Sequence, residues 1–495
     1  MPLPDLIEII PLTAPVRAEI TVPGSKSITN RALVLTALAE GETVLKGALW
    51  SEDTQVMVEC LQELGFMVNV APDPDEVCNR TITVYGLGGK VPRGGTEQSP
   101  LELFVGNAGT AARFLAAMVC LGEGVYRLHG VPRMHERPQA ALFHALRQLG
   151  YRIDSPNDRL PALIHGGGPT LTGSSRGNEA PSEPKKSESL LTSAATCKSC
   201  RVSIEESSQF ASALLLCAKV GGWTVDVVGE NAEESPYVAM TSELIKAFPY
   251  RGGEFQIEPD ASSGSYFWGG SWLLVHRELR AAYQEAKDKT SGKPFPPKGG
   301  LLLRVDPSQV SVRNWPTSKW QIDADVVDLI SAPATSSKFT HARQFVGFPS
   351  EFSREHDLAD AIMTLITLAP ENSQMIRFTD LGRLRVQECE RVVALRTELT
   401  NCGAKVIEEG DTLTVHPSKL HGAEIETYND HRMAMCFAVL GLKVPGIKIR
   451  NPACVKKTFP NFFQKLATPP PHGLGVEIRD GDTGRKLGLE ELFAE

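Results

Sequence analysis

The sequence predicts an α/β fold made of repeated βαβ-type units, because one pattern recurs along the chain. The pattern consists of a helix of small apolar residues, a Gly/Glu turn, a β-branched strand, an amphipathic helix and a second strand. It occupies residues 32–70 and returns over residues 114–153. Each unit has one apolar helical face, which is buried best when several units gather around a shared core.

Weaker copies of this unit begin near Ala211, Ala261, Asp360 and Met433, which brings the expected number to six. The chain has 495 residues, of which 42% are hydrophobic, so it is long enough to form more than one core. We therefore expect two similar domains, each built from three units.

Three segments interrupt the repeats. Residues 167–200 are rich in Ser, Gly, Pro and Lys, which is typical of a surface insertion with little fixed structure. Residues 278–300 predict a polar helix and a turn, and residues 469–495 predict a Pro-led tail after the last unit.

Composition limits the classes of function. The net charge of −8 provides no general basic field for nucleic acid or an anionic membrane, so neither is expected as a partner. The N-terminus lacks a basic flank and a cleavable apolar core, and no run of about 18 apolar residues occurs. A cytoplasmic location follows as an expectation.

The ten cysteines are scattered through the chain, which indicates reduced thiols rather than a disulfide framework. Cys197 and Cys200 have the spacing of metal ligands, but a zinc site would need a second such pair, and the sequence has none. We therefore expect no metal.

The stretch 23–31, "PGSKSITNR", places hydroxyls and cations at the start of an apolar helix. It is not a P-loop, because Ser25 stands directly before Lys26, where that loop needs a glycine. Hydroxyl groups and free backbone N–H groups at a helix N-terminus bind anions, and Lys26 and Arg31 add charge. An ordinary N-cap with solvated cations is the alternative.

Further polar motifs stand at helix entrances. In "LFVGNAGTAARFL", Gly106 and Gly109 allow backbone N–H groups to approach a ligand, although a simple turn and cap is equally compatible with this motif. Hydroxyl, amide and cationic groups recur at other entrances, at Arg133, Arg137, Ser207, Ser208, Gln209, Arg391, Arg432 and Lys457. An isolated arginine is usually solvated, but several at helix entrances of an acidic protein indicate one converging anion site.

Asp360 is a lone carboxylate at the entrance of the apolar helix in "HDLADAIMT". It either caps the helix dipole or, beside gathered cations, acts as a general base.

The motifs, taken in order, identify a resemblance to the 5-enolpyruvylshikimate-3-phosphate synthase family. They span residues 14–466 and read "PGSKSITNRALVL", "LFVGNAGTAARFL", "RMHERP", "SSQF", "DASSGSYF", "YNDHRMAM" and "KKTFP". The resemblance implies the enolpyruvyl transferase fold, an inside-out α/β barrel of two domains with the active site in the interdomain cleft. It divides the chain into residues 24–259, with the insertion, and residues 1–23 plus 260–468, followed by the tail.

The resemblance also implies an activity: transfer of the enolpyruvyl group of phosphoenolpyruvate to the 5-hydroxyl of shikimate 3-phosphate, with release of phosphate and no cofactor. The chain would act as a monomer. Catalysis would use Lys26, Asp360 and Glu388. Phosphoenolpyruvate would bind Lys26, Gly109, Arg137, Gln209, Arg391, Arg432 and Lys457. Shikimate 3-phosphate would bind Lys26, Ser27, Arg31, Ser207, Ser208, Gln209, Tyr237, Asp360, Arg383 and Gln387.

The sequence departs from the family on the acceptor side. Gln387 stands where the family usually has lysine, Arg383 where it has asparagine, and Glu234 where it has a phosphate-binding serine. These changes keep two alternatives open: an enolpyruvyl transferase with another alcohol as acceptor, and a non-catalytic phosphoenolpyruvate-binding protein. Because tolerant family members often fill the glycine at position 109, the resemblance further implies sensitivity to glyphosate.

Overall fold

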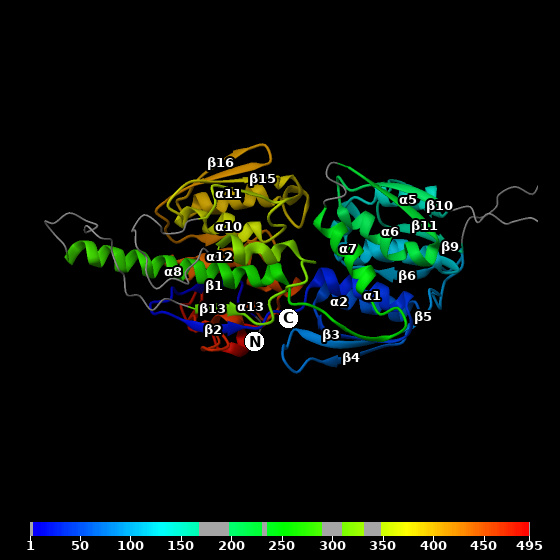
Figure 1. Ribbon diagram of the computed structural model, residues 1–495, viewed down its shortest axis with the longest axis horizontal. Coiled ribbons are helices and arrows are strands. Elements are labelled where there is room, and N and C mark those ends of the chain that lie inside the picture. The colour runs from blue at the N-terminus through cyan, green and yellow to red at the C-terminus, as the bar shows by residue number, and fades with distance from the viewer. Residues whose placement is uncertain (1–2, 168–197, 230–234, 290–308, 331–347, 495) are drawn as a thin grey trace, which may run out of the picture.

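The computed structural model describes residues 3–167, 198–229, 235–289, 309–330 and 348–494. Figure 1 shows two lobes side by side, with the middle of the chain crossing from one to the other. Two clusters of buried apolar residues correspond to the lobes. One draws on residues 28–257, and the other on residues 3–22 and 266–494. We call these the N-terminal and C-terminal domains.

The N-terminal domain contains three sheets. The first has the order β12-β3-β5-β4 and the second β6-β7-β9-β8, while β10 and β11 form a parallel pair. The strand bounds are β3 (Glu40–Leu49), β4 (Val68–Pro72), β5 (Asn79–Leu87), β6 (Leu101–Phe104), β7 (Gly124–His129), β8 (Arg152–Asp154), β9 (Ala162–Gly166), β10 (Lys198–Ser203), β11 (Trp223–Val228) and β12 (Gly253–Gln256).

Helices α1, α3 and α6 pack against one another at the centre of this domain, with the sheets outside them. Their small and apolar side chains are almost all buried, which explains why these helices read as uniformly apolar in the sequence. The helix bounds are α1 (Lys26–Leu38), α2 (Glu52–Glu63), α3 (Gly109–Met118), α4 (Pro132–Glu136), α5 (Ala140–Gln148), α6 (Ser208–Gly221) and α7 (Pro236–Ala247).

The C-terminal domain repeats this plan. Its sheets have the orders β18-β19-β1-β20, β13-β2 and β14-β15-β17-β16. The strands are β1 (Leu6–Ile9), β2 (Arg17–Ile20), β13 (Gln309–Val312), β14 (Glu351–Ser353), β15 (Ile376–Thr379), β16 (Lys405–Glu409), β17 (Thr412–His416), β18 (Glu424–Ile425), β19 (Ile447–Arg450) and β20 (Ile478–Asp480). Helices α8, α10 and α12 pack together inside the sheets.

The helices of this domain are α8 (Ala261–Lys289), α9 (Val326–Ile330), α10 (Ile362–Leu368), α11 (Arg391–Asn401), α12 (His431–Gly441) and α13 (Phe462–Ala467). Among the described residues, each domain thus has three sheets around a central group of three helices. This matches the six repeated units expected from the sequence.

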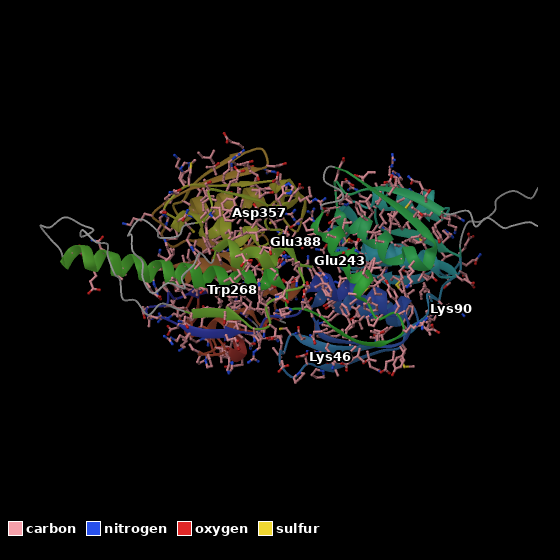
Figure 2. All side chains as sticks on the ribbon, viewed as in Figure 1. Lys46, Lys90, Glu243, Trp268, Asp357 and Glu388 are labelled. Atoms are coloured by element: carbon pink, nitrogen blue, oxygen red, sulfur yellow. The ribbon has the colours of Figure 1, made fainter. Side chains whose placement is uncertain are left out.

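The chain crosses between the domains at two adjacent points. The Asp260 N–H donates to the Pro23 carbonyl at 2.8 Å, and Gly24 forms a β-bridge with Pro259. Figure 2 shows the boundary between the side chains of the two lobes, with Glu243 on one side and Glu388 on the other.

A buried polar cluster joins the domains beside these crossings. Glu76 of the N-terminal domain accepts hydrogen bonds from Thr21 at 2.6 Å and from Asn461 at 2.8 Å. Lys465 forms an ion pair with the same carboxylate at 2.6 Å. Glu76 is only 4% exposed, so water competes little with these three contacts. Together they hold the two domains to each other on the side where the chain crosses.

Residues 469–495, expected as a tail, belong to the C-terminal domain as far as the structure describes them. Strand β20 pairs antiparallel with β1, and Leu474, Ile478 and Leu492 are buried in the core. The prediction failed because the prolines at the start of this segment suggested a tail, although the apolar residues that follow are spaced for burial.

The other interruptions are described only in part. Residues 168–197 and 290–300 lie outside the described residues, as do Glu234 and Cys197. The expected polar helix is the second half of α8, which continues to Lys289. No helix in the described ranges combines the length and the apolar character that crossing a membrane requires.

Candidate active site

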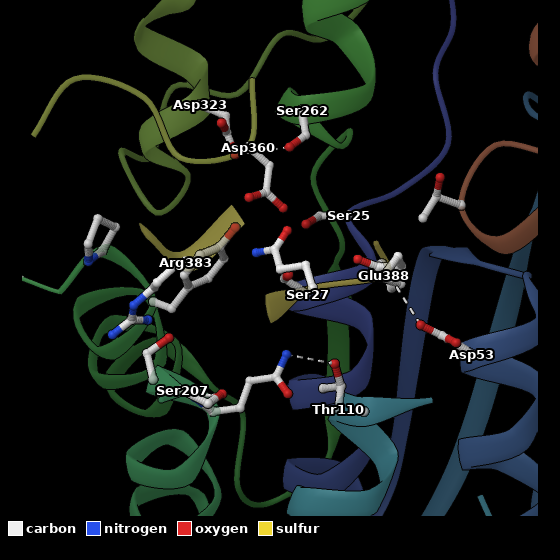
Figure 3. A pocket seen from close by; sticks show the side chains of 18 of the residues that line it. Ser25, Ser27, Asp53, Thr110, Ser207, Ser262, Asp323, Asp360, Arg383 and Glu388 are labelled. Carbon is white, nitrogen blue, oxygen red and sulfur yellow. Dashed lines mark hydrogen bonds and ion pairs between the residues drawn. The ribbon is translucent and has the colours of Figure 1, made fainter. Parts of the chain in front are cut away.

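One cavity lies between the two domains and takes its walls from both. All residues predicted for catalysis and binding line it: Lys26, Ser27, Arg31, Gly109, Arg137, Ser207, Ser208, Gln209, Tyr237, Asp360, Arg383, Gln387, Glu388, Arg391, Arg432 and Lys457. Figure 3 shows Asp323 and Asp360 on one side, facing Ser27, Ser207 and Thr110 on the other. The structure therefore brings the predicted residues together.

Lys26 is the first residue of α1, at the point where the chain enters the N-terminal domain. Its ammonium pairs with Asp53 at 3.1 Å, and this carboxylate is nearly buried at the start of α2. The pair holds the lysine at the edge of the cavity, within reach of an anion at the α1 N-terminus.

Arg31 lines the cavity, and its guanidinium is held by protein groups. Its guanidinium donates to Thr241 at 2.8 Å, to the Ser27 carbonyl at 2.9 Å and to Ser212 at 3.0 Å. Burial lowers the pKa of Arg31 to about 10. Its hydrogen bonds connect α1 to α6 and α7, so in this structure it supports the cavity wall.

Gly109 begins α3 and lies directly beneath two arginines. Arg113 donates to Gln209 at 3.3 Å, and Arg137 donates to the Asn107 carbonyl at 3.1 Å. Burial and then the neighbouring Arg137 hold the pKa of Arg113 well below its usual range. A Cβ atom at Gly109 would come closest to Arg113 Nη1 and would lie 2.7 Å from Arg137 Nη2, so any larger residue here requires these guanidinium groups to shift.

Ser207 caps α6 and accepts a hydrogen bond from the Gln209 N–H at 3.2 Å. Gln209 reaches back to Thr110 at 3.4 Å and so connects the α6 entrance to the α3 entrance. Tyr237 stands opposite in α7, where burial strongly raises the pKa of its hydroxyl and keeps it protonated as a donor. This wall thus offers hydroxyl and amide groups beside the charged side chains of Arg113 and Glu206.

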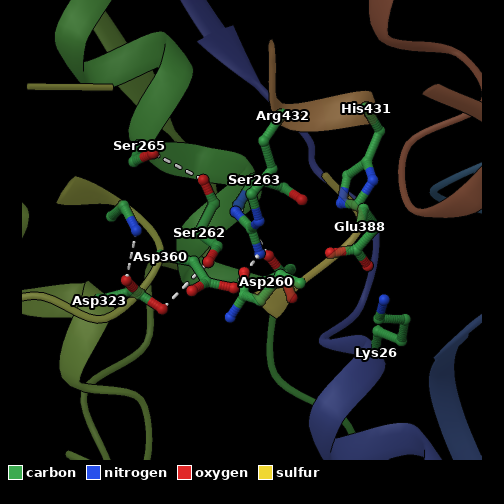
Figure 4. A network of polar contacts seen from close by, with 12 residues as sticks. Lys26, Asp260, Ser262, Ser263, Ser265, Asp323, Asp360, Glu388, His431 and Arg432 are labelled. Carbon is green, nitrogen blue, oxygen red and sulfur yellow. Dashed lines mark hydrogen bonds and ion pairs between the residues drawn. The ribbon is translucent and has the colours of Figure 1, made fainter. Parts of the chain in front are cut away.

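Asp360 lies at the centre of the arginines of the C-terminal domain. It pairs with Arg354 at 3.0 Å through Oδ1 and with Arg432 at 3.1 Å through Oδ2, and Arg391 lies 4.0 Å away. Burial opposes its ionisation, but Arg432, Arg354 and Arg391 together hold its pKa well below the usual range. Figure 4 shows Asp360 beside Arg432 and the neighbouring carboxylate of Asp323.

Glu388 joins a second group of charges in the same wall. It accepts hydrogen bonds from Lys457 at 2.9 Å and from Arg391 at 2.8 Å. Burial opposes its ionisation, but Lys457 and then Arg391 hold its pKa well below the usual range. Asp430 completes the group by accepting from Arg391 Nε at 2.6 Å and from Arg391 Nη2 at 3.2 Å.

Two of the three residues that depart from the family pattern lie in the described ranges, and both contact protein groups. Arg383 donates across the cleft to the Ile204 carbonyl of the N-terminal domain. Gln387 accepts a hydrogen bond from Arg391. Arg383 thus bridges the domains on the side of Ser207, while Gln387 is turned toward the other arginines.

Several lining residues were not predicted from the sequence. Asp53, Arg113, Asp323, Arg354 and His431 line the cavity, and Asp430 lies behind it. Asp430 could have been found, because an aspartate directly before an apolar helix is a strong N-cap signal. Arg354 follows a three-residue strand, and nothing in its local sequence marks it.

The described residues contain no cluster of three or more His, Cys, Asp or Glu side chains arranged to hold a metal ion. The side chains that line the cavity offer cations, hydroxyls, amides and carboxylates, a set suited to anionic substrates and proton transfer.

Comparison with known proteins agrees with this architecture. The family model for EPSP synthase (3-phosphoshikimate 1-carboxyvinyltransferase) matches residues 11–276 and 304–466. A 3-phosphoshikimate 1-carboxyvinyltransferase of Nostoc sp. is 33% identical and is aligned over 93% of this chain and 99% of its own. A protein of the same name from Opitutus terrae is 35% identical over 94% of this chain and 98% of its own.

Solved structures share the fold at low identity. EPSP synthase from Acinetobacter baumannii aligns with a TM-score of 0.62 and 19% identity, covering 95% of this chain and 99% of that one. The enolpyruvyl transferase NikO from Streptomyces tendae aligns with a TM-score of 0.54 and 14% identity, covering 96% and 98%. The predicted α/β fold of two similar domains is confirmed, and the chain belongs to the EPSP synthase family.

Proposed function

We propose that this protein transfers the enolpyruvyl group of phosphoenolpyruvate to the 5-hydroxyl of shikimate 3-phosphate and releases phosphate. One observation carries the proposal: in a member of this family, the groups predicted for both substrates line a single interdomain cavity. Protonation of the phosphoenolpyruvate methylene gives a cationic carbon, which the alcohol attacks as its proton leaves. Loss of a methyl proton from the adduct then expels phosphate.

Phosphoenolpyruvate would lie between the α3 entrance and the arginines of the C-terminal domain. Its two anionic groups match the cations gathered there, which are Lys26, Arg137, Arg391, Arg432 and Lys457, with Gly109 at the α3 entrance and Gln209 at the α6 entrance. Because these residues come from both domains, an anion between them would draw the domains together.

Shikimate 3-phosphate would lie on the side of the α6 and α7 entrances. Ser27, Ser207, Ser208 and Tyr237 supply hydroxyl groups there, and Arg383 supplies charge. Arg31 would hold this wall in place through its three contacts.

Asp360 is the proposed base for the 5-hydroxyl. A carboxylate held by two arginines is a weak base, so we infer that it gains basicity when the arginines turn to the substrates. Lys26 and Glu388 are the proposed proton-transfer groups at the phosphoenolpyruvate carbons. Each is already paired with an opposite charge, Lys26 with Asp53 and Glu388 with Lys457.

The test is phosphate release by the purified protein given phosphoenolpyruvate and shikimate 3-phosphate, with the product identified by mass. Asp360→Asn should lower kcat by about 10²- to 10⁴-fold, because the amide cannot accept the proton. Asp357→Asn is the matched control, since Asp357 lies three residues earlier and outside the cavity lining. Absence of turnover by the unaltered protein would refute the proposal.

Transfer to another alcohol is the second candidate, and the position of Gln387 favours it. Gln387 stands where the family usually has lysine, and its side chain accepts a hydrogen bond from Arg391. The acceptor side therefore has no cation at this position. Turnover of a different phosphorylated or sugar alcohol, at a higher kcat/KM than that of shikimate 3-phosphate, would establish it. The cytoplasmic location, the monomeric state and the division into domains near residues 23 and 260 stay predictions.

A further inference from the structure

Arg354 is a buried arginine of the cavity wall that the family motifs do not include. It directly follows β14, and its backbone N–H donates to the carbonyl of Thr379, the last residue of β15. Strands β14 and β15 are parallel, so their carboxyl ends lie at the same edge of the sheet. Arg383 follows β15 by four residues, in a short 3₁₀ helix. Ligands of α/β sheets bind at this edge.

The protein does not satisfy the Arg354 guanidinium fully. The residue is 5% exposed, and its Nη2 donates to Asp360 at 3.0 Å. Its Nε is buried and has no hydrogen-bond partner in the described part of the chain. A guanidinium offers five N–H donors in a planar fork, so donors are left for a ligand oxygen.

The charges around Arg354 favour an anion beside it. One carboxylate, Asp360, is shared by Arg354 and Arg432, and so cannot neutralise both. Arg383 is close enough that burial and then Arg354 lower its pKa, while the carboxylates of Glu355 and Asp360 act in the opposite direction. Two like charges in a cavity wall repel each other unless an anion lies between them.

This anion belongs on the acceptor side. Arg383 donates to the Ile204 carbonyl, three residues before Ser207, and so lies over the α6 entrance. Burial and then Asp360 raise the pKa of Tyr237 in the facing α7, and Arg354 is close enough to act in the opposite direction. Since Gln387 is turned to Arg391, the acceptor's phosphate needs another cation in this wall.

We propose that Arg354 is a specificity-determining residue that, with Arg383, binds the phosphate of the acceptor, and that in doing so it leaves Asp360. The inference rests on the proposed function, because it assigns a phosphorylated acceptor to the same cavity. Asp360 Oδ1 would then be free to take the hydroxyl proton only after the acceptor has bound. An acceptor without a phosphate would leave Arg354 on Asp360 and the base restrained.

The experiment compares Arg354→Gln and Arg354→Lys with the unaltered protein, using shikimate 3-phosphate and unphosphorylated shikimate as acceptors. Glutamine should lower kcat/KM for shikimate 3-phosphate by about 10- to 100-fold, because a charged hydrogen bond to phosphate is lost. For shikimate kcat/KM should not fall, because glutamine removes the charge that restrains Asp360 when this acceptor is bound, and the change in KM for phosphoenolpyruvate should stay below about threefold. Arg354→Lys should lower kcat/KM for shikimate 3-phosphate less than Arg354→Gln does, since lysine keeps the positive charge but lacks the planar fork of N–H donors of arginine.

Arg377→Gln is the matched control, because Arg377 is an exposed arginine of β15 that pairs with Glu351. It should change neither acceptor's kinetics. An equal loss for both acceptors, or no loss for either, would overturn the inference.

Calorimetric titration of shikimate 3-phosphate separates this inference from the proposed function. If the unaltered protein shows no turnover, the proposed function fails, and the role of Arg354 is still read from binding. A dissociation constant at least tenfold weaker in Arg354→Gln supports that role, and an unchanged constant overturns it.

Discussion

Asp430 gives the sharpest test of how this cavity holds its arginines. Its carboxylate is fully buried and accepts two hydrogen bonds from Arg391, at 2.6 and 3.2 Å, and one from the Arg432 N–H at 2.8 Å. Asp430→Asn removes the negative charge and turns one acceptor into a donor. Asparagine still caps α12, so the helix should form as before.

The expected magnitude follows from the burial of both partners. Removing one member of a buried ion pair costs about 3–5 kcal/mol. Glu388 still faces Arg391, so we expect the lower end, about 3 kcal/mol. If Arg391 holds phosphoenolpyruvate, its loss of orientation weakens a charged hydrogen bond of about 1.5–3 kcal/mol, which should lower kcat/KM for this substrate by about 10- to 100-fold at 1.4 kcal/mol per decade.

The assay is phosphate release with phosphoenolpyruvate varied at saturating shikimate 3-phosphate, together with urea unfolding of the same sample. Asp411→Asn is the matched control, because Asp411 forms an exposed pair with Arg385 and such pairs contribute little. A fall of less than threefold in kcat/KM, with normal unfolding, would refute the reasoning that Asp430 positions Arg391.

Three further predictions concern space, protonation and domain contact. Gly109→Ala should raise KM for phosphoenolpyruvate about tenfold by displacing Arg137, measured by steady-state kinetics, and an unchanged KM would count against it. Burial and then Asp360 raise the pKa of Asp323 from 3.8 to about 6, so the folded protein binds a proton that the unfolded chain has lost, and stability falls as pH rises from 4 to 6. Asp323→Asn should remove this fall, so that between pH 4 and pH 8 the free energy of unfolding of the variant rises by up to ~3 kcal/mol relative to that of the unaltered protein. Urea unfolding at each pH measures both, and the same pH dependence in the two proteins would contradict the prediction. Glu76→Gln should lower the free energy of unfolding by about 3 kcal/mol and the added Lys465→Met should restore most of it, and failure of this rescue would show that the ion pair is not the cause.

The fold and the contents of the cavity were accessible from the sequence, since both leave regular local signals. Repeated apolar helices followed by Gly/Glu turns predicted six units, and the described parts of the chain form three sheets in each domain. The predicted anion-binding residues sit at helix entrances, where their chemistry is visible in a few consecutive letters. This is why residues as distant as Lys26 and Lys457 could be assigned to one cavity.

What the sequence could not provide are the contacts between distant elements. Arg31 has the charge and the position in its motif that are typical of a ligand-binding residue. Its hydrogen bonds to Ser212 and Thr241, however, depend on how α6 and α7 pack. Arg354 reaches the cavity only because β14 pairs with β15. The apolar residues of 469–494 needed the edge of β1, which lies at the other end of the sequence.

The position of β1 has a consequence for protein synthesis. This strand lies between β19 and β20, so its neighbours on both sides are made more than 400 residues later. The N-terminal domain can close its core once residue 257 has left the ribosome. Until β19 and β20 have been made, Leu6–Ile9 is a strand without a sheet, and chaperones that shield such segments would have to protect it for that time.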